Sequence, residues 1–264
     1  MIASEPLKIT DIQMKNKKNA LILAAVILLL ASACNKEYYV DTGVLTPNYN
    51  GTILQYLKSK PAMFDSTVRV ISLAGMEDVL DKERITFFAP TSSSIYKSVR
   101  ALNAFLLQNG RDTVRELSQI KKEVWRKTLS QYIFKGTSQL KDYPQLDTLA
   151  YTAFPGQSYA SYGDNGRIMN IGVVFNDAVN GTTSIKYAGY RQLFLSYIKD
   201  FTKPQQSLVN IPVATSDIMP TNGIIHVLRQ ATLSGSTLIN KHNFGFVNNI
   251  FINDVLASGI SPTP

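Results

Sequence analysis

The chain has 264 residues, of which 45% are hydrophobic, and a formal charge of +8 at pH 7. This length is enough for one large domain or two small ones with a sizeable core. No base-reading motif accompanies the basic residues, so nucleic acid is a poor candidate partner. The sequence also lacks a glycine-rich phosphate loop and a histidine-cysteine cluster at metal-ligand spacing, so neither a cofactor nor a metal is expected.

Residues 14–33 have the organisation of an export signal. Met14 and three lysines lead into eleven apolar residues at 20–30, and three small residues follow. The apolar run is shorter than the ~20 residues that a membrane-spanning helix needs. Residues 1–33 are therefore predicted to be a signal peptide whose true start is Met14.

The only cysteine of the chain, Cys34, directly follows this signal. The arrangement resembles a bacterial lipobox, which implies a diacylglyceryl group on the Cys34 sulfur, cleavage before Cys34 and acylation of the new amino group. Dual acylation gives stable membrane anchoring, whereas a lone exported thiol has no disulfide partner. The alternative is an ordinary signal with Cys34 near the cut by chance. Because residue 35 is Asn rather than Asp, the prediction is an outer-membrane lipoprotein rather than one retained at the inner membrane.

The next segment predicts a tether followed by helices. Residues 34–50 lack helical periodicity and contain glycine and proline, as expected of a spacer between membrane and fold. Apolar spacing within 53–80 predicts two or three short helices, interrupted at Pro61 and Gly75.

A buried strand and two longer helices are predicted next. The apolar run at 85–90 ends in proline and predicts a strand, and Thr91 is placed to cap the helix that follows. Apolar residues at helical spacing then predict another helix across 114–132.

Strand patterns dominate beyond residue 137. The turn signal at 163–166 predicts a hairpin, and strand-like patterns continue through 182–214. A central strand is predicted within 221–233, after an Asn-Gly turn with positive φ. Helices first and strands later indicate an α+β fold. Residues 234–264 form an apolar, asparagine-rich extension that adds edge strands, covers part of the core or presents a pairing surface.

Two segments resemble the signature boxes of the fasciclin (FAS1) domain family. ITFFAPTSSSI (85–95) is similar to its Thr-x-Phe-Ala-Pro-Thr box, and DIMPTNGIIHVL (217–228) to its Asn-Gly-x-x-His box. Between them lies the tyrosine of the family's Tyr-His pair, with isoleucine in place of the histidine. The matching residues are Thr86, Phe88, Ala89, Pro90, Thr91, Tyr132, Asn222, Gly223 and His226.

The resemblance covers about residues 48–233, so 51–233 are expected to form a fasciclin-like domain with an enlarged middle region at 145–210. It implies a wedge of β-strands packed with several helices, and adhesion or matrix binding without catalysis. Exported members of this style resemble lipoproteins that Gram-negative bacteria encode beside outer-membrane glycan-uptake systems.

The expected function is therefore a lipid-anchored binding module of the cell envelope, which holds an extracellular polymer, with a glycan favoured, or a neighbouring protein. The first alternative is an accessory subunit of an outer-membrane glycan-uptake complex, docked through 145–210 or the C-terminal extension. The second is a hydrolase with a pair of carboxylates that its sequence surroundings do not mark.

Candidates for ligand contact are aromatic and acidic. Tyr151, Tyr159 and Tyr162 have ring faces that suit the C–H face of a pyranose, although strands also favour tyrosine for packing. Asp217 and Ile218 are similar to an Asp-Ile motif of integrin-binding animal members, and capping of a local turn is the simpler role for Asp217.

Two further features have a structural and a functional interpretation. His226 lies in an apolar strand and is expected to be a buried imidazole that is hydrogen-bonded to backbone. The basic segment 121–127 is expected to be a solvated helix face, and its functional alternative is attraction to anionic polysaccharide or lipid head groups.

Overall fold

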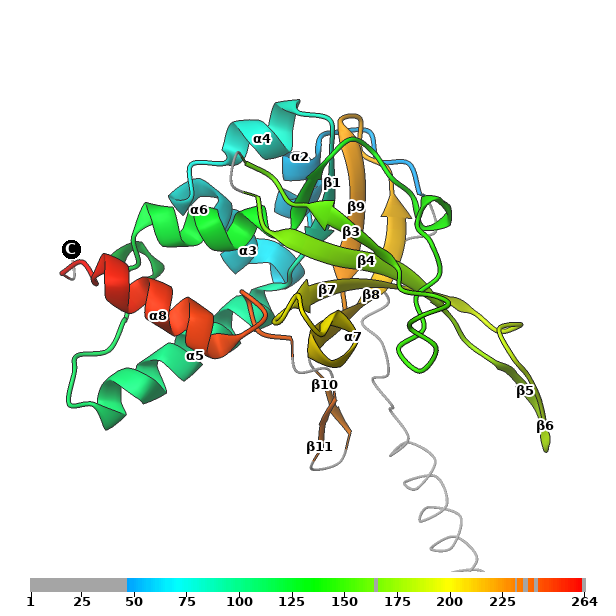
Figure 1. The fold of residues 1–264 in the computed structure, drawn as a ribbon. Coiled ribbons are helices and arrows are strands. Elements are labelled where there is room, and N and C mark those ends of the chain that lie inside the picture. The colour runs from blue at the N-terminus through cyan, green and yellow to red at the C-terminus, as the bar shows by residue number, and fades with distance from the viewer. Residues whose placement is uncertain (1–46, 164–165, 231, 235–236, 240–241, 263–264) are drawn as a thin grey trace, which may run out of the picture. The chain divides into compact units, whose positions relative to one another are not determined.

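The computed structural model describes residues 47–163, 166–230, 232–234, 237–239 and 242–262 (Figure 1). The predicted signal peptide and Cys34 lie outside the described residues. Among the residues that are described, no helix combines the length and apolar character needed to cross a membrane.

Three short helices open the fold: α2 (Ile53–Lys58), α3 (Pro61–Leu73) and α4 (Glu77–Lys82). Thr52 caps the start of α2 through a capping box. The Thr52 side chain accepts from the Gln55 backbone N–H, and the Gln55 side chain accepts from the Thr52 backbone N–H. Pro61 is the first residue of α3, where its missing N–H costs no helical hydrogen bond. The predicted interruptions at Pro61 and Gly75 are confirmed.

The predicted strand and helix around the first box are present as β1 (Ile85–Ala89) and α5 (Ser92–Gln108). Thr91 occupies the N-cap position of α5, but its side chain makes no capping hydrogen bond, so that detail of the prediction is wrong. Its hydroxyl instead lies 2.9 Å from the Ser93 hydroxyl, and its carbonyl accepts from Ser94.

The single helix predicted across 114–132 is wrong. The chain forms only a 3-10 turn, η1 (Leu117–Gln119), and the helix α6 (Lys122–Ser130). The Asn103 side chain accepts from the Val114 N–H and donates to the Val114 carbonyl. Gln119 Oε1 accepts from the backbone N–H groups of Arg115 and Glu116. Because side chains satisfy these backbone groups, the segment before α6 has no need of helical hydrogen bonds.

The sheet contains the strands β2 (Ile133–Lys135), β3 (Gln157–Ala160), β4 (Ile168–Phe175), β7 (Arg191–Ile198), β8 (Leu208–Ile218) and β9 (Gly223–Leu228) in addition to β1. Their order is β2-β1-β9-β8-β7-β4-β3, and all neighbours are antiparallel except β1 and β9. The β3–β4 hairpin and the buried central strand β9 confirm two sequence predictions.

The enlarged middle region contributes small elements outside this sheet. The strands β5 (Ala178–Asn180) and β6 (Thr183–Ile185) pair only with each other, and their hairpin projects away from the sheet (Figure 1). The short helix α7 (Pro204–Ser207) precedes β8, and a 3-10 turn, η2 (Leu140–Asp142), lies just before the enlarged region.

The predicted positive φ at Asn222-Gly223 is wrong, because neither residue has one. The Asn222 side chain instead joins three segments: it accepts from the Ile53 N–H at 2.8 Å and donates to the carbonyls of Leu80 and Glu83. Gly223 is required for space, since a Cβ there would collide with the Ile85 carbonyl of β1.

The C-terminal extension covers part of the core. After the hairpin β10 (Thr232–Ser234) and β11 (Thr237–Ile239), the helix α8 (Asn248–Ser258) packs against α5 and α6 (Figure 1). Phe244 and Val255 are fully buried, and Phe251 packs against Trp125. Helices packed beside a mixed sheet confirm the predicted α+β fold.

Candidate functional site

The two signature boxes lie side by side on β1 and β9, which are neighbouring interior strands of the sheet. The parallel pairing of β1 and β9 sets Phe88 opposite His226, and Phe88, Ala89 and His226 are all fully buried. The hydroxyl of Thr86 donates to the Gly136 carbonyl and accepts from the Ser138 N–H, each at 2.9 Å. These contacts give the box residues a structural role inside the fold.

His226 has the environment that the sequence predicts. Its Nδ1 accepts from the Asp217 backbone N–H, so the ring carries its proton on Nε2, which donates to the Ser138 carbonyl at 3.0 Å. Burial lowers the pKa of His226 to about 4, although the Ser138 carbonyl and the Asp217 carboxylate oppose this shift. The ring is therefore neutral near pH 7.

Asp217 lies at an irregularity of β8 and has a φ of 62°. Its carboxylate accepts from the backbone N–H of Leu140 at 2.8 Å, at the start of η2. The predicted capping role is thus found, but the turn that it caps is distant in sequence rather than local. Its neighbour Ile218 is 1% exposed and belongs to the core.

Tyr132 lies at the centre of a second buried polar network. Its hydroxyl accepts from the Gly245 N–H at 3.0 Å and shares a hydrogen bond with His242 Nε2 at 3.1 Å. The rings of Phe244 and Phe246 stack on it, with centroids 5.5 Å and 4.9 Å away. Burial raises the pKa of Tyr132, and burial together with nearby Lys97 lowers that of His242 to about 3.

The three candidate tyrosines have different surroundings. Tyr159 packs edge-on against Phe134 and Tyr143, which explains it by packing. Tyr151 is half-buried in the turn before β3. Tyr162 is half-buried, and its hydroxyl donates to Glu83 at 2.6 Å.

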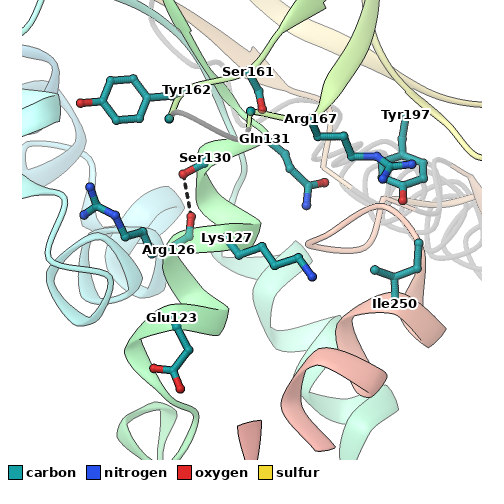
Figure 2. Close-up of a pocket in the computed structure, with 12 residues that line it drawn as sticks. Glu123, Arg126, Lys127, Ser130, Gln131, Ser161, Tyr162, Arg167, Tyr197 and Ile250 are labelled. Atoms are coloured by element: carbon teal, nitrogen blue, oxygen red, sulfur yellow. Dashed lines mark hydrogen bonds between the residues drawn. The ribbon is translucent and has the colours of Figure 1, made fainter. Parts of the chain in front are cut away.

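A cavity of about 550 Å³ adjoins Tyr162 (Figure 2). One wall is formed by α6 together with Gln131, and a second by the turn between β3 and β4. Tyr197 of β7 and Ile250 of α8 also line it. The volume is within the range of ~300–1,000 Å³ that small-molecule sites occupy.

The cavity is basic. Its described lining contains three cationic side chains, Arg126, Lys127 and Arg167, and one carboxylate, Glu123. Arg126 and Lys127 belong to the basic segment 121–127, so the cavity gives that segment a concave surface. A hydrolytic pair of carboxylates is not present among the described residues of this lining.

Each cation is held in a defined position. Lys127 forms an ion pair with Asp254 of α8 at 2.7 Å. Arg126 donates to the Gly75 carbonyl at 3.1 Å. The Arg167 guanidinium lies 4.0 Å from the centroid of the Tyr197 ring and donates to the Ile198 carbonyl. The cavity therefore presents fixed positive charge.

Sequence patterns identify only part of this site. The basic segment and Tyr162 draw attention before the structure is considered, but Gln131, Ser161 and Arg167 belong to no motif. They meet only because the β3–β4 turn lies beside the end of α6 (Figure 2). Within the described part of the chain, no group of three or more His, Cys, Asp or Glu residues could hold a metal ion.

Solved structures include one that is similar to this chain. No family model matches the chain, and no curated protein matches it. The solved structure is a FAS1 domain pair from the insect cell adhesion molecule fasciclin I, with a TM-score of 0.41 and 17% sequence identity. The match covers 67% of this chain and 49% of the other, so the chain spans about half the length of the structure that it matches.

Proposed function

We propose that this chain is a lipid-anchored binding module of the cell envelope, of the fasciclin type, which holds an extracellular polymer. The observation that carries the proposal is the basic cavity between α6 and the β3–β4 turn. The ordered pair of boxes in the sequence supports the fasciclin assignment, and their residues are used inside the fold. The cavity, with its fixed cations, is thus the feature that is open to a ligand.

Binding is tested with the full-length chain in detergent micelles. Purified polysaccharides, both neutral and acidic, are immobilised, and retention of the chain is measured at low and at high salt. We expect retention on at least one acidic polymer and weakening at high salt, because the cations of the cavity are partly exposed and are screened by ions. Retention on none of the polymers would contradict the proposal.

Anchoring through Cys34 is a separate part of the proposal. In the Cys34→Ser variant no thioether can form, so we expect the protein to stay unprocessed and to take up no labelled fatty acid. The matched control is Ser32→Ala, which keeps a small residue before the cut and leaves Cys34 in place. Normal maturation and lipid labelling of Cys34→Ser would contradict the anchor.

The second candidate function is an accessory subunit of an outer-membrane glycan-uptake complex. The β5–β6 hairpin favours it, because this hairpin carries exposed apolar residues away from the sheet: Val179 is 71% exposed and Ile185 is 60% exposed. Affinity purification from solubilised outer membrane tests this candidate. A transporter recovered at equal stoichiometry, and lost from a Val179→Asp, Ile185→Asp double variant, would favour it over the polymer-binding module.

A further inference from the structure

Three buried polar atoms without a hydrogen-bond partner belong to residues that line the same basic cavity: Gln131 Oε1, Ser161 Oγ and Arg167 Nε. Gln131 is only 5% exposed and Ser161 only 4%. Buried polar side chains are nearly always hydrogen-bonded, because an unpaired group loses its contacts with water without gaining others. Three such groups at one cavity point to a ligand that supplies the missing partners.

The side chains are arranged to receive one. Figure 2 shows the Gln131 amide in the space between Arg167 and Lys127, with the Ser161 side chain above it. The two described ends of the turn, Ser161 and Arg167, are joined by a hydrogen bond in which the Ser161 N–H donates to the Arg167 carbonyl at 2.9 Å. A Cβ on Gly166 would collide with the Ser161 carbonyl, so this approach requires glycine at position 166.

We infer that this cavity binds an acidic sugar residue of a polymer, a hexuronate, with the carboxylate toward Arg167 and Lys127 and ring hydroxyls bonded to Gln131 and Ser161. This inference rests on the proposed binding function and names its ligand. The charge of the cavity lining suits a ligand that carries a single carboxylate. Within the described residues neither Arg126 nor Arg167 forms an ion pair, and only Lys127 is neutralised by a carboxylate.

The polar groups favour a sugar over the phosphodiester of a lipid head group. An unpartnered amide oxygen accepts hydrogen bonds, so Gln131 needs a donor on the ligand. Glu123, at the same cavity, also only accepts when it is ionised. A phosphodiester provides acceptors alone, whereas a hexuronate provides several hydroxyl donors and one carboxylate.

The test is calorimetric titration of the full-length chain in detergent micelles with trigalacturonate, and with galactotriose as the neutral probe. We expect trigalacturonate to bind at least tenfold more tightly than galactotriose, and its affinity to fall as salt is added.

Two variants separate a binding role from a structural one. Ser161→Ala and Gln131→Met remove the unpartnered atoms while nearly preserving volume, and no hydrogen bond within the described residues is lost from Ser161 Oγ or Gln131 Oε1. Each variant is expected to weaken trigalacturonate binding at least fivefold, with a thermal midpoint that is unchanged or higher. The matched control is Lys121→Gln, which removes a charge beside α6 outside the cavity lining and is expected to change affinity less than twofold.

Each other outcome overturns the inference in a distinguishable way. If trigalacturonate binds equally well to both variants, the cavity is not the site, and the proposed binding function stands. If neither saccharide binds while an acidic polymer still retains the chain, the hexuronate assignment is wrong and the binding function stands. If anionic phospholipid vesicles bind more tightly than trigalacturonate, and the same variants weaken them, the cavity takes a lipid head group. Loss of all retention removes both proposals.

Discussion

Phe88 and His226 lie opposite each other in the parallel pairing of β1 and β9, with ring centroids 4.9 Å apart. The pair joins the two sequence boxes in the interior of the fold, where His226 is neutral. Because burial lowers the pKa of His226 from 6.5 to about 4, and that of His242 from 6.5 to about 3, both histidines connect stability to pH.

The first prediction is that the free energy of unfolding declines as the pH falls from 7 to 5. Below pH 6.5 the unfolded chain binds protons that the folded chain does not, so the stability present above pH 6.5 is lost progressively toward pH 4. The expected slope is up to about 1.4 kcal/mol per pH unit for each histidine. Urea denaturation at each pH between 7 and 5 measures this slope. The interval lies above the pH range in which most carboxylates titrate.

His226→Gln provides the control for this pH dependence, because the chain has only two histidines. With one of the two removed, we expect the slope between pH 6 and pH 5 to fall to about half. A slope that is equally steep in this variant would show that His226 does not contribute.

The second prediction concerns the close approach of β9 to β1 at Gly223. A Cβ at this position would meet the Ile85 carbonyl and also Ile53 at 2.8 Å, so Gly223→Ala must displace one strand. We expect a loss of about 3 kcal/mol or more in the free energy of unfolding. In Gly110→Ala the new Cβ meets nothing within 4 Å, and only the φ of +66° is unfavourable, so about 1 kcal/mol is expected. Equal losses in urea denaturation would contradict the steric argument.

The third prediction concerns the Tyr132 hydroxyl. Tyr132→Phe leaves the Gly245 N–H and His242 Nε2 without this partner in a buried setting, which costs about 1–3 kcal/mol. Thermal unfolding monitored by circular dichroism measures the loss. Tyr190→Phe is the matched control, because that side chain belongs to a residue that is 66% exposed, and a change within about 0.5 kcal/mol is expected. If the two variants are equally stable, the buried network contributes nothing.

Local sequence patterns predict the helices and strands of this fold better than they predict its long-range contacts. The apolar run of β1, the helices on either side of Pro61 and the central strand β9 are recognisable because periodicity and proline act within a few residues. The segment before α6 has helical apolar spacing and yet is not helical. Asn103, which belongs to the preceding helix, forms hydrogen bonds with the Val114 backbone, and no local pattern contains that information.

The candidate site was predictable only in part for the same reason. The boxes identify residues that hold strands together, as Asn222 does by joining α2 and α4 to the start of β9. The cavity instead combines α6, the β3–β4 turn and α8, which are distant in sequence. A charge cluster at 121–127 indicates a basic surface, but the chain's packing decides whether that surface is concave.

The fourth prediction is that the residues after 241 are part of the cooperative fold. Phe251 of α8 is 2% exposed and its ring lies 5.7 Å from Trp125 and 6.3 Å from Phe244. Phe251→Ala removes this contact and leaves a cavity between α8 and α6, so we expect a loss of about 3–5 kcal/mol in a single unfolding transition. Leu149→Ala, at a residue that is 98% exposed, should change stability by less than about 0.5 kcal/mol. If Phe251→Ala unfolds at the same denaturant concentration as the unaltered chain, α8 lies on the fold without stabilising it, and Trp125 must be buried by other residues.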